Sequence, residues 1–316
     1  MSNALGPKHE AHGLPSVGRN AARDWQRLYP FASHELRIDG LRYHYLDEGR
    51  GEPLVLVHGN PTWSFYWRNV VLGLRERYRL IVPDHMGCGL SDKPAEYPYR
   101  LAQHIANLRR LLATLDVQQA TLLVHDWGGA IGLGAAVAEP RRFARLVLFN
   151  TAAFRSSRIP WRIRVCRTPL LGPAMVRGLN AFARAALWMA VEHHDRMTPA
   201  VRAGLLAPYD SWAHRIAIQS FVDDIPLSVE HPSYAALAAI EEGLCHLRWL
   251  PTQIIWGMRD WCFSPYFLDR WLDFFPEATV HRLADAGHYV IEDAHERIVP
   301  LVERFLASHP VGAILH

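Results

Sequence analysis

The stretch that most constrains this chain runs from Thr121 to Gly132, with the sequence TLLVHDWGGAIG. Its three apolar residues, 122–124, predict a buried strand. His125, Asp126 and Trp127 then predict an abrupt turn, and the small residues after them suit a helix that packs closely on its neighbours. The turn therefore places one carboxylate, that of Asp126, at a helix N-terminus, where unpaired backbone N–H groups favour negative charge.

A strand that turns sharply into a glycine-rich helix, with a reactive side chain at the apex, is the nucleophile elbow of the α/β-hydrolase fold. The rest of the chain agrees with this class. Alternating apolar residues around Asp39-Gly40 predict a β-hairpin, and further strands are predicted at 54–57, 80–82, 146–149 and 253–256 and around residue 280. We therefore predict an α/β protein with a mostly parallel central sheet flanked by helices.

The strand–helix alternation stops between residues 155 and 246, where helical patterns broken by prolines replace it. An α-helical insertion of this kind is how the fold builds a cap over its site. The predicted division is a flexible N-terminal extension over 1–28, a first core part over 29–154, the cap over 155–246, and a second core part over 247–316.

Composition excludes several other classes. The net charge of +3 over 316 residues is too small to indicate nucleic-acid binding. No signal pattern or membrane span is predicted, and the four cysteines are scattered, as in a reduced, cytoplasmic protein. The cluster Glu192-His-His-Asp195 lacks an i,i+4 histidine pair, so neither a metal nor a cofactor is predicted.

Three residues follow the chain order of this fold's catalytic triad, namely nucleophile, acid and histidine. They are Asp126, Asp260 and His288, each expected at the carboxyl end of a strand. A single aspartate there is more often a helix cap. As a set they predict that Asp126 attacks an sp³ carbon to form an alkyl ester, that His288 activates water against this ester, and that Asp260 holds the imidazole.

Asn60 and Trp127 form a second predicted constellation. An amide NH₂ and an indole N–H are uncharged donors, which suit a departing anion such as a halide. The backbone N–H groups of Trp127 and of the Asn60 loop are the expected oxyanion hole. Taken alone, Trp127 could be a packing residue.

Four segments carry a family resemblance: HGNPTWSFYWRN (58–69), DHMGCGLSDKP (84–94), HDWGG (125–129) and AGHYV (286–290). They resemble the haloalkane dehalogenase family. The resemblance implies a nucleophile at Asp126, a base at His288, an acid at Asp260, and halide binding by Asn60 and Trp127. The family can also place its acid after the preceding strand, but there this chain has Asn150, which cannot ionise.

The segments FNTAAF (149–154), VRGLNAF (176–182) and PYDSWAHRI (208–216) are similar to the third subfamily, the β-lactone decarboxylases of bacterial long-chain olefin biosynthesis. This resemblance implies that a cis-3,4-dialkyl-oxetan-2-one is split into a cis-alkene and CO₂. Haloalkane dehalogenation remains the alternative, because both reactions would use the same five residues. A long apolar slot would favour two alkyl chains, and a small closed cavity would favour short haloalkanes.

Two other functions remain open at this point. An epoxide hydrolase would need tyrosine donors from the cap, which offers only Tyr209 and Tyr234. A non-catalytic ligand-binding module would need only the fold.

The cap sequence is strongly basic. Residues 155–191 contain seven arginines, interleaved with apolar residues, and no acidic residue. This pattern suits peripheral contact with an anionic membrane or an assembly with other olefin-biosynthesis enzymes. An ordinary solvated cap is the alternative, since arginine stems often cover apolar surface.

Overall fold

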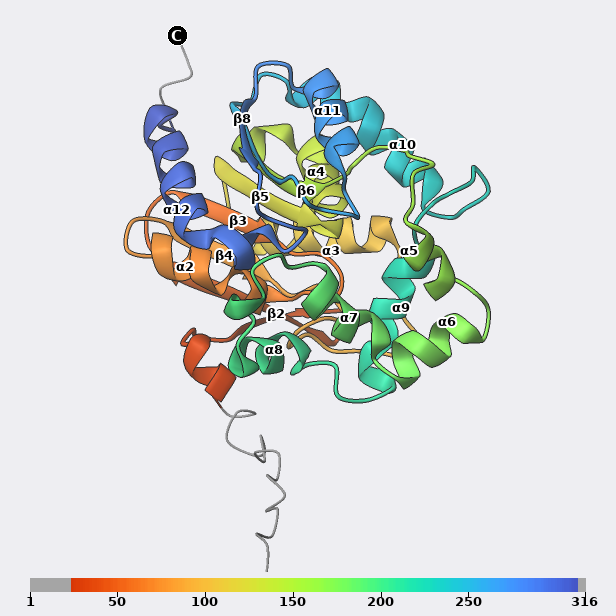
Figure 1. The fold of residues 1–316 in the computed structure, drawn as a ribbon. Helices are drawn as coiled ribbons and strands as arrows, with labels where there is room; N and C mark the ends of the chain where they lie inside the picture. The colour runs from red at the N-terminus through yellow and green to blue at the C-terminus, as the bar shows by residue number, and fades with distance from the viewer. Residues whose placement is uncertain (1–23, 312–316) are drawn as a thin grey trace, which may run out of the picture.

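A single eight-stranded sheet organises the computed structural model, which describes residues 24–311 (Figure 1). The spatial order is β1-β2-β4-β3-β5-β6-β7-β8; β1–β2 and β2–β4 pair antiparallel and all other neighbours pair parallel. The strands are β1 His34–Ile38, β2 Leu41–Gly49, β3 Pro53–Val57, β4 Arg79–Pro83, β5 Ala120–Asp126, β6 Phe143–Thr151, β7 Thr252–Gly257 and β8 Thr279–Leu283. The predicted α/β class and the mostly parallel sheet are confirmed.

Each face of the sheet is covered by helices, and the strands alternate between two hydrophobic clusters. In β3, Leu54 and Leu56 belong to one cluster, and Val55 and Val57 to the other, as expected from the two-residue period of a strand. The helices of the core are α2 Arg68–Leu74, α3 Leu101–Thr114, α4 Trp127–Ala138, α10 Tyr234–Gly243, α11 Pro265–Phe274 and α12 Val290–Ser308, with the 3-10 helices η2 Ser64–Trp67, η3 Pro140–Arg142 and η7 Leu244–Leu247. Because both faces are covered, the inner parallel strands β5, β6 and β7 are buried along their whole length, whereas the edge strand β8 is partly exposed.

The predicted hairpin is present as β1 and β2. Ile38 pairs with Leu41 across the turn. Asp39 and Gly40 both have positive φ, 51° and 82°, the conformation of a two-residue hairpin turn, which Asp-Gly tolerates well.

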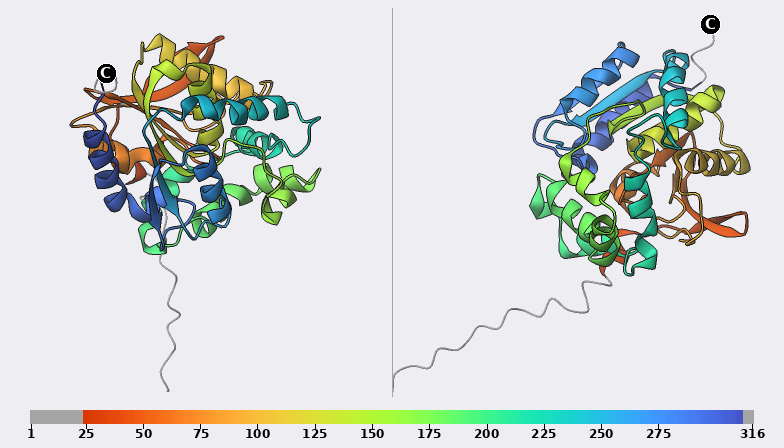
Figure 2. Two further views of the ribbon diagram at one scale, coloured as in Figure 1. Left: turned by 90° about the horizontal axis from the view of Figure 1, so that it is seen from above. Right: turned by 90° about the vertical axis from the view of Figure 1, so that its right-hand side faces the viewer.

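Between β6 and β7, the helical elements from α5 to α9 lie together at one end of the sheet (Figure 2). These elements are α5 Trp161–Cys166, α6 Leu171–Pro173, the π-helical turn η4 Ala174–Gly178, α7 Ala181–Met189, η5 His194–Arg196, α8 Pro199–Leu206, η6 Ala213–Arg215 and α9 Ile216–Asp223. They occupy most of the stretch for which the sequence predicts the cap. α10 falls in the same predicted stretch, but it packs on α4 and α3 of the core. The division at 154/155 and 246/247 stays a prediction.

The N-terminal segment differs from the expectation. Residues 1–23 of the predicted extension lie outside the described residues, but Trp25–Leu28 form the 3-10 helix η1. The Trp25 ring lies 5.8 Å from that of Trp63 and 6.0 Å from that of Phe65. This short helix therefore packs on the core through Trp25 and Leu28, which bury apolar surface there.

Candidate active site

The turn between β5 and α4 holds Asp126 in an unusual backbone conformation, with φ 53° and ψ −127°. Such a conformation is costly for a residue with a Cβ and needs support from its surroundings. Part of that support is the absence of side chains nearby. A Cβ on Gly59 would lie 2.0 Å from Asp126 Oδ1, and one on Gly128 would lie 2.1 Å from the carbonyl oxygen of Val57. The small residues thus let the elbow approach the β3 loop.

The carboxylate of Asp126 is only 7% exposed and has three partners. Its Oδ1 accepts the backbone N–H of Asn60 at 2.6 Å, and the backbone N–H of Trp127 also donates to the carboxylate. Oδ2 lies 3.7 Å from Nε2 of His288. Burial raises the pKa of Asp126, while the His288 charge and the two N–H groups oppose the rise by favouring the anion. The two N–H groups are those predicted for an oxyanion hole.

His288 and Asp260 form a buried pair. Nδ1 of His288 lies 2.8 Å from Oδ2 of Asp260. The other oxygen of Asp260 accepts the backbone N–H groups of Cys262 at 2.6 Å and Phe263 at 3.0 Å. Burial lowers the pKa of His288, but the charges of Asp260 and Asp126 and the hydrogen bond to Asp260 outweigh it, so the pKa is raised. The pair can therefore hold a proton on the imidazole between two carboxylates.

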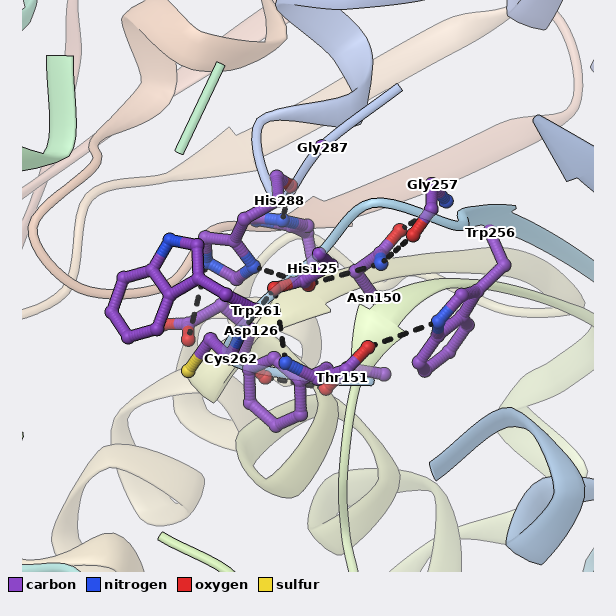
Figure 3. Close-up of polar contacts among 12 residues, drawn as sticks. His125, Asp126, Asn150, Thr151, Trp256, Gly257, Trp261, Cys262, Gly287 and His288 are labelled. Atoms are coloured by element: carbon purple, nitrogen blue, oxygen red, sulfur yellow. Dashed lines mark hydrogen bonds and ion pairs between the residues drawn. The ribbon is translucent and has the colours of Figure 1, made fainter. Parts of the chain in front are cut away.

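Asn150, at the end of β6, has a role that the sequence did not assign. Its side-chain NH₂ donates to Oδ2 of Asp260 and to the carbonyl oxygen of Gly257, both at 3.0 Å, and its Oδ1 accepts the N–H of Gly257 at 2.8 Å (Figure 3). Asn150 thus ties β6 to β7 and orients the carboxylate of Asp260. Its position after a strand, opposite Asp260, was the available signal.

His125 is a second residue that the sequence left without a role. Its Nε2–H donates to the carbonyl oxygen of His288 at 2.8 Å, and the two rings lie 4.7 Å apart. Burial lowers the pKa of His125 well below its usual range, so the ring is neutral. It thereby fixes the backbone that presents His288.

Asn60 and Trp127 line the same cavity, but their side-chain N–H groups differ in whether they are already hydrogen-bonded. Within residues 24–311, no hydrogen bond engages the indole N–H of Trp127, whose ring packs 5.3 Å from Phe221. The Asn60 amide is already in use, because its Nδ2 donates to the carbonyl oxygen of Ile218 in α9 at 3.1 Å. Asn60 therefore contributes its backbone N–H to the carboxylate and keeps one amide hydrogen for another acceptor.

A cavity of about 420 Å³ begins at Asp126 and runs between the core and the cap. The polar residues that line it near the carboxylate are Asn60, Trp127 and His288, and apolar side chains supply most of the remaining lining. Its wall includes two exposed residues, Trp161 and Leu227, which are 67% and 40% exposed. The volume lies within the usual range for small-ligand sites, and the wall is mostly apolar, with the Asp126 carboxylate among its few polar groups.

The two cap tyrosines do not reach this cavity. Tyr209 is buried and donates its hydroxyl to the carbonyl oxygen of Thr62, and Tyr234 lies under the guanidinium of Arg155. Neither lines the cavity. The tyrosine donors that epoxide opening would need are thus missing from it.

Two acidic segments of the cap have different environments. No group of His, Cys, Asp and Glu within the described chain could hold a metal ion, including Glu192–Asp195. Adjacent acids such as Asp223 and Asp224 are usually solvated, but Asp224 is only 1% exposed. It accepts hydrogen bonds from the backbone N–H of Leu101, the guanidinium of Arg100 and the hydroxyl of Ser233, so it fixes the start of α3.

The sheet, the elbow at its centre and the cap above it define an α/β-hydrolase. The family described as having the alpha/beta hydrolase fold matches residues 52–178. A cis-3-alkyl-4-alkyloxetan-2-one decarboxylase of Shewanella oneidensis is 44% identical over 287 residues, covering 89% of this chain and 90% of the relative. A protein of the same name from Xanthomonas campestris pv. campestris is 42% identical, with coverages of 90% and 98%.

Dehalogenases are similar at lower identity. Haloalkane dehalogenase 2 of Mycobacterium tuberculosis is 34% identical over 285 residues, covering 88% of this chain and 96% of the relative. The crystal structure of haloalkane dehalogenase DbeA from Bradyrhizobium elkani superposes with a TM-score of 0.80 at 26% identity, covering 88% and 98%. The chain belongs to the haloalkane dehalogenase family of α/β-hydrolases, and its identity to the two decarboxylases exceeds its identity to these dehalogenases.

Proposed function

We propose that this protein is a β-lactone decarboxylase that converts a cis-3,4-dialkyl-oxetan-2-one into a cis-alkene and CO₂ through an ester of Asp126. The observation that carries the proposal is the largely apolar cavity of about 420 Å³ whose wall includes the Asp126 carboxylate and the exposed residues Trp161 and Leu227. Two alkyl chains need a large apolar cavity of this kind, whereas a short haloalkane needs only a small closed one. The name of the two more similar relatives supports the same substrate.

The chemistry balances without an added reagent. Oδ2 of Asp126 attacks the ring carbon bonded to the ring oxygen, with inversion; that C–O bond breaks and a carboxylate is released. Asn60 and Trp127 are placed to donate to this new anion. Loss of CO₂ then sends the electron pair of the breaking C–C bond into a new C=C bond and expels Asp126 as carboxylate. Inversion followed by anti elimination keeps the alkyl groups cis.

His288 assists the second step of this proposed sequence. Its imidazolium, 3.7 Å from Oδ2 of Asp126, stabilises the carboxylate as it leaves, which matters because a buried anion is costly without a partner. Asp260 keeps the imidazolium in place and Asn150 keeps Asp260 in place. In this scheme these are positioning roles around the reacting carboxylate.

Haloalkane dehalogenation is the second candidate, and the unengaged indole N–H of Trp127 beside Asp126 favours it. The first step would be the same displacement, with halide leaving toward Trp127 and Asn60. The neutral form of His288 would then activate water to hydrolyse the ester.

The substrate class also bears on where the enzyme works. A long-chain β-lactone is nearly insoluble in water, so we include in the proposal a cytoplasmic enzyme that receives it from an assembly of olefin-forming enzymes or from a membrane surface. No helix within residues 24–311 is long and apolar enough to cross a bilayer, so such membrane contact would be peripheral.

A paired assay on the purified protein tests the proposal. One arm supplies a cis-β-lactone with two medium-length alkyl chains and measures the alkene by gas chromatography. The other arm supplies 1-bromobutane or 1,2-dibromoethane and measures halide release. Fast alkene formation with slow halide release is expected. Fast halide release without alkene would instead make the protein a dehalogenase.

A further inference from the structure

The surface around the cavity opening is unusually apolar. Trp161 at the start of α5 is 67% exposed, and Leu170 and Leu171, just before and at the start of α6, are 88% and 49% exposed. α5 and α6 pack against each other, and Trp161 and Leu227 both line the cavity. We call the following set the mouth face: Trp161, Arg162, Arg164, Leu170, Leu171 and Leu227.

Leu170 is held outward by its backbone. It is the central residue of a three-residue turn, with φ 66° and ψ −52°, closed by the N–H of Leu171 donating to the carbonyl oxygen of Pro169 at 2.7 Å. This turn is strained for a residue with a Cβ, and glycine or asparagine would adopt positive φ at lower cost. A leucine that is nearly fully exposed gains no packing energy within the chain in return. Its apolar side chain is therefore available to something outside the folded chain.

The two charged residues of the mouth face, Arg162 and Arg164, are both basic. Neither they nor the neighbouring Arg158 forms an ion pair with any carboxylate of residues 24–311. Arg158 stacks on Tyr266 at 4.0 Å, and Arg162 lies 5.2 Å from the Trp161 ring. The bordering acids are Glu230, on the Leu227 side, and Asp223, whose charge acts on Arg167; both are exposed. Guanidinium groups beside exposed Trp and Leu match the phosphates and acyl chains of an anionic bilayer surface.

The mouth face is also continuous with the cavity. Trp161, Arg162 and Leu227 are at once exposed and part of the cavity wall. We propose that the mouth face docks on an anionic lipid bilayer, so that the substrate passes from the membrane between Trp161 and Leu227 to Asp126 without crossing water. This inference rests on the proposed function for the substrate, but the docking itself can be measured without turnover.

Co-sedimentation of the full chain with vesicles tests the docking. Wild-type protein is expected to bind phosphatidylglycerol vesicles, to bind phosphatidylcholine vesicles much more weakly, and to be released by salt. The test variant is Arg164→Glu/Leu170→Asn, which reverses one charge and removes the apolar tip; neither residue lines the cavity. We expect it to lose vesicle affinity by about tenfold or more.

The matched control is Arg304→Glu/Trp249→Asn, which makes the same kinds of change at exposed positions outside the cap. It should keep wild-type vesicle affinity. Equal binding to both vesicle types, no binding to either, or equal loss in the test and control variants would overturn the docking proposal. No binding to either would leave the mouth face to a protein partner.

Turnover separates this inference from the proposed function. With a short-chain β-lactone dissolved in buffer, the test variant should form alkene at the wild-type rate. With a long-chain β-lactone held in phosphatidylglycerol vesicles, its rate of alkene formation should fall by the same factor as its vesicle affinity. If wild-type protein forms no alkene in buffer, the proposed function fails while sedimentation still decides docking. If alkene forms in buffer and the variant keeps wild-type speed on vesicles, docking for substrate entry is wrong.

Discussion

At the scale of single residues, the proposed chemistry depends on the charge of His288, which two carboxylates control. Burial alone would lower the pKa of this imidazole, and Asp260 and Asp126 reverse the direction. The hydrogen bond from Nδ1 to Asp260 also fixes which ring nitrogen faces Asp126. A buried imidazolium without such partners would be unstable.

Replacing Asp260 with Asn should therefore lower the pKa of His288, since burial is then less opposed. Turnover should fall by about 10³–10⁴-fold, the size of loss seen when the acid of a triad becomes an amide. An NMR titration of the imidazole and a kcat measurement check both. Asp285→Asn, a change at a surface aspartate paired with Arg297, is the control. An unchanged imidazole pKa in Asp260→Asn would contradict this account.

Replacing Asn150 should reduce turnover less than replacing Asp260, because Asn150 acts on the reacting atoms only through its hydrogen bond to Asp260. Asn150→Ala removes one hydrogen bond to the acid and two to Gly257, and a lost buried hydrogen bond costs about 1–3 kcal/mol. We expect kcat to fall by roughly 5- to 30-fold with KM nearly unchanged. A larger rise in KM than fall in kcat would show that Asn150 shapes the cavity instead.

At the scale of elements, the elbow requires that the loop after β3 carry no side chain at Gly59. Gly59→Ala should shift Asp126 or the loop, because the new Cβ would lie 2.0 Å from Oδ1. Overpacking of this kind costs about 1–3 kcal/mol of unfolding free energy, and turnover should drop with it. Gly178→Ala is the matched control, since its nearest neighbour would be 3.8 Å away. Urea unfolding gives the stability of the two variants, and a steady-state assay gives their kcat. Equal stability and equal kcat in Gly59→Ala and Gly178→Ala would contradict the packing argument.

The strands, the hairpin and the elbow were predictable because each depends on residues that are neighbours in the sequence. Apolar runs indicate the strands, an Asp-Gly turn indicates the hairpin, and small residues indicate the elbow. The positions of Asp126, Asp260 and His288 follow from the same logic, since each ends or follows a strand. What could not be predicted depends on distant contacts. The Asn60 amide is held by Ile218, 158 residues away, and Asp224 is buried by partners from α3 and from the loop before α10.

At the scale of the whole molecule, buried histidines should make the fold sensitive to acid. His104 is stacked on Phe221 at 4.6 Å, and neither ring nitrogen has a hydrogen-bond partner in the described chain. Burial, with a smaller contribution from His58, lowers the pKa of His104 from 6.5 to about 3. Between these values the unfolded chain binds a proton that the folded chain does not, so stability falls as pH drops from 6.5 toward 3.

Replacing His104 with Leu, a side chain of similar size, should flatten this dependence. Unfolding free energies measured in urea between pH 7 and about pH 4 check it. The readout is the slope against pH, which a general loss of stability would not change. An identical slope in wild type and His104→Leu would show that other groups cause the acid sensitivity.

The claim that Asp126 forms a covalent ester underlies both candidate reactions, and mass spectrometry of the intact protein tests it most directly. In His288→Ala the second step should be slow, so the ester should accumulate after exposure to a cis-β-lactone, 1-bromobutane or 1,2-dibromoethane. We predict a mass increase equal to the whole lactone, or to the haloalkane less HBr. The adduct should map to Asp126 by peptide analysis and be absent in His288→Ala/Asp126→Asn. No adduct with any of the three compounds, or an adduct on another residue, would contradict the mechanism.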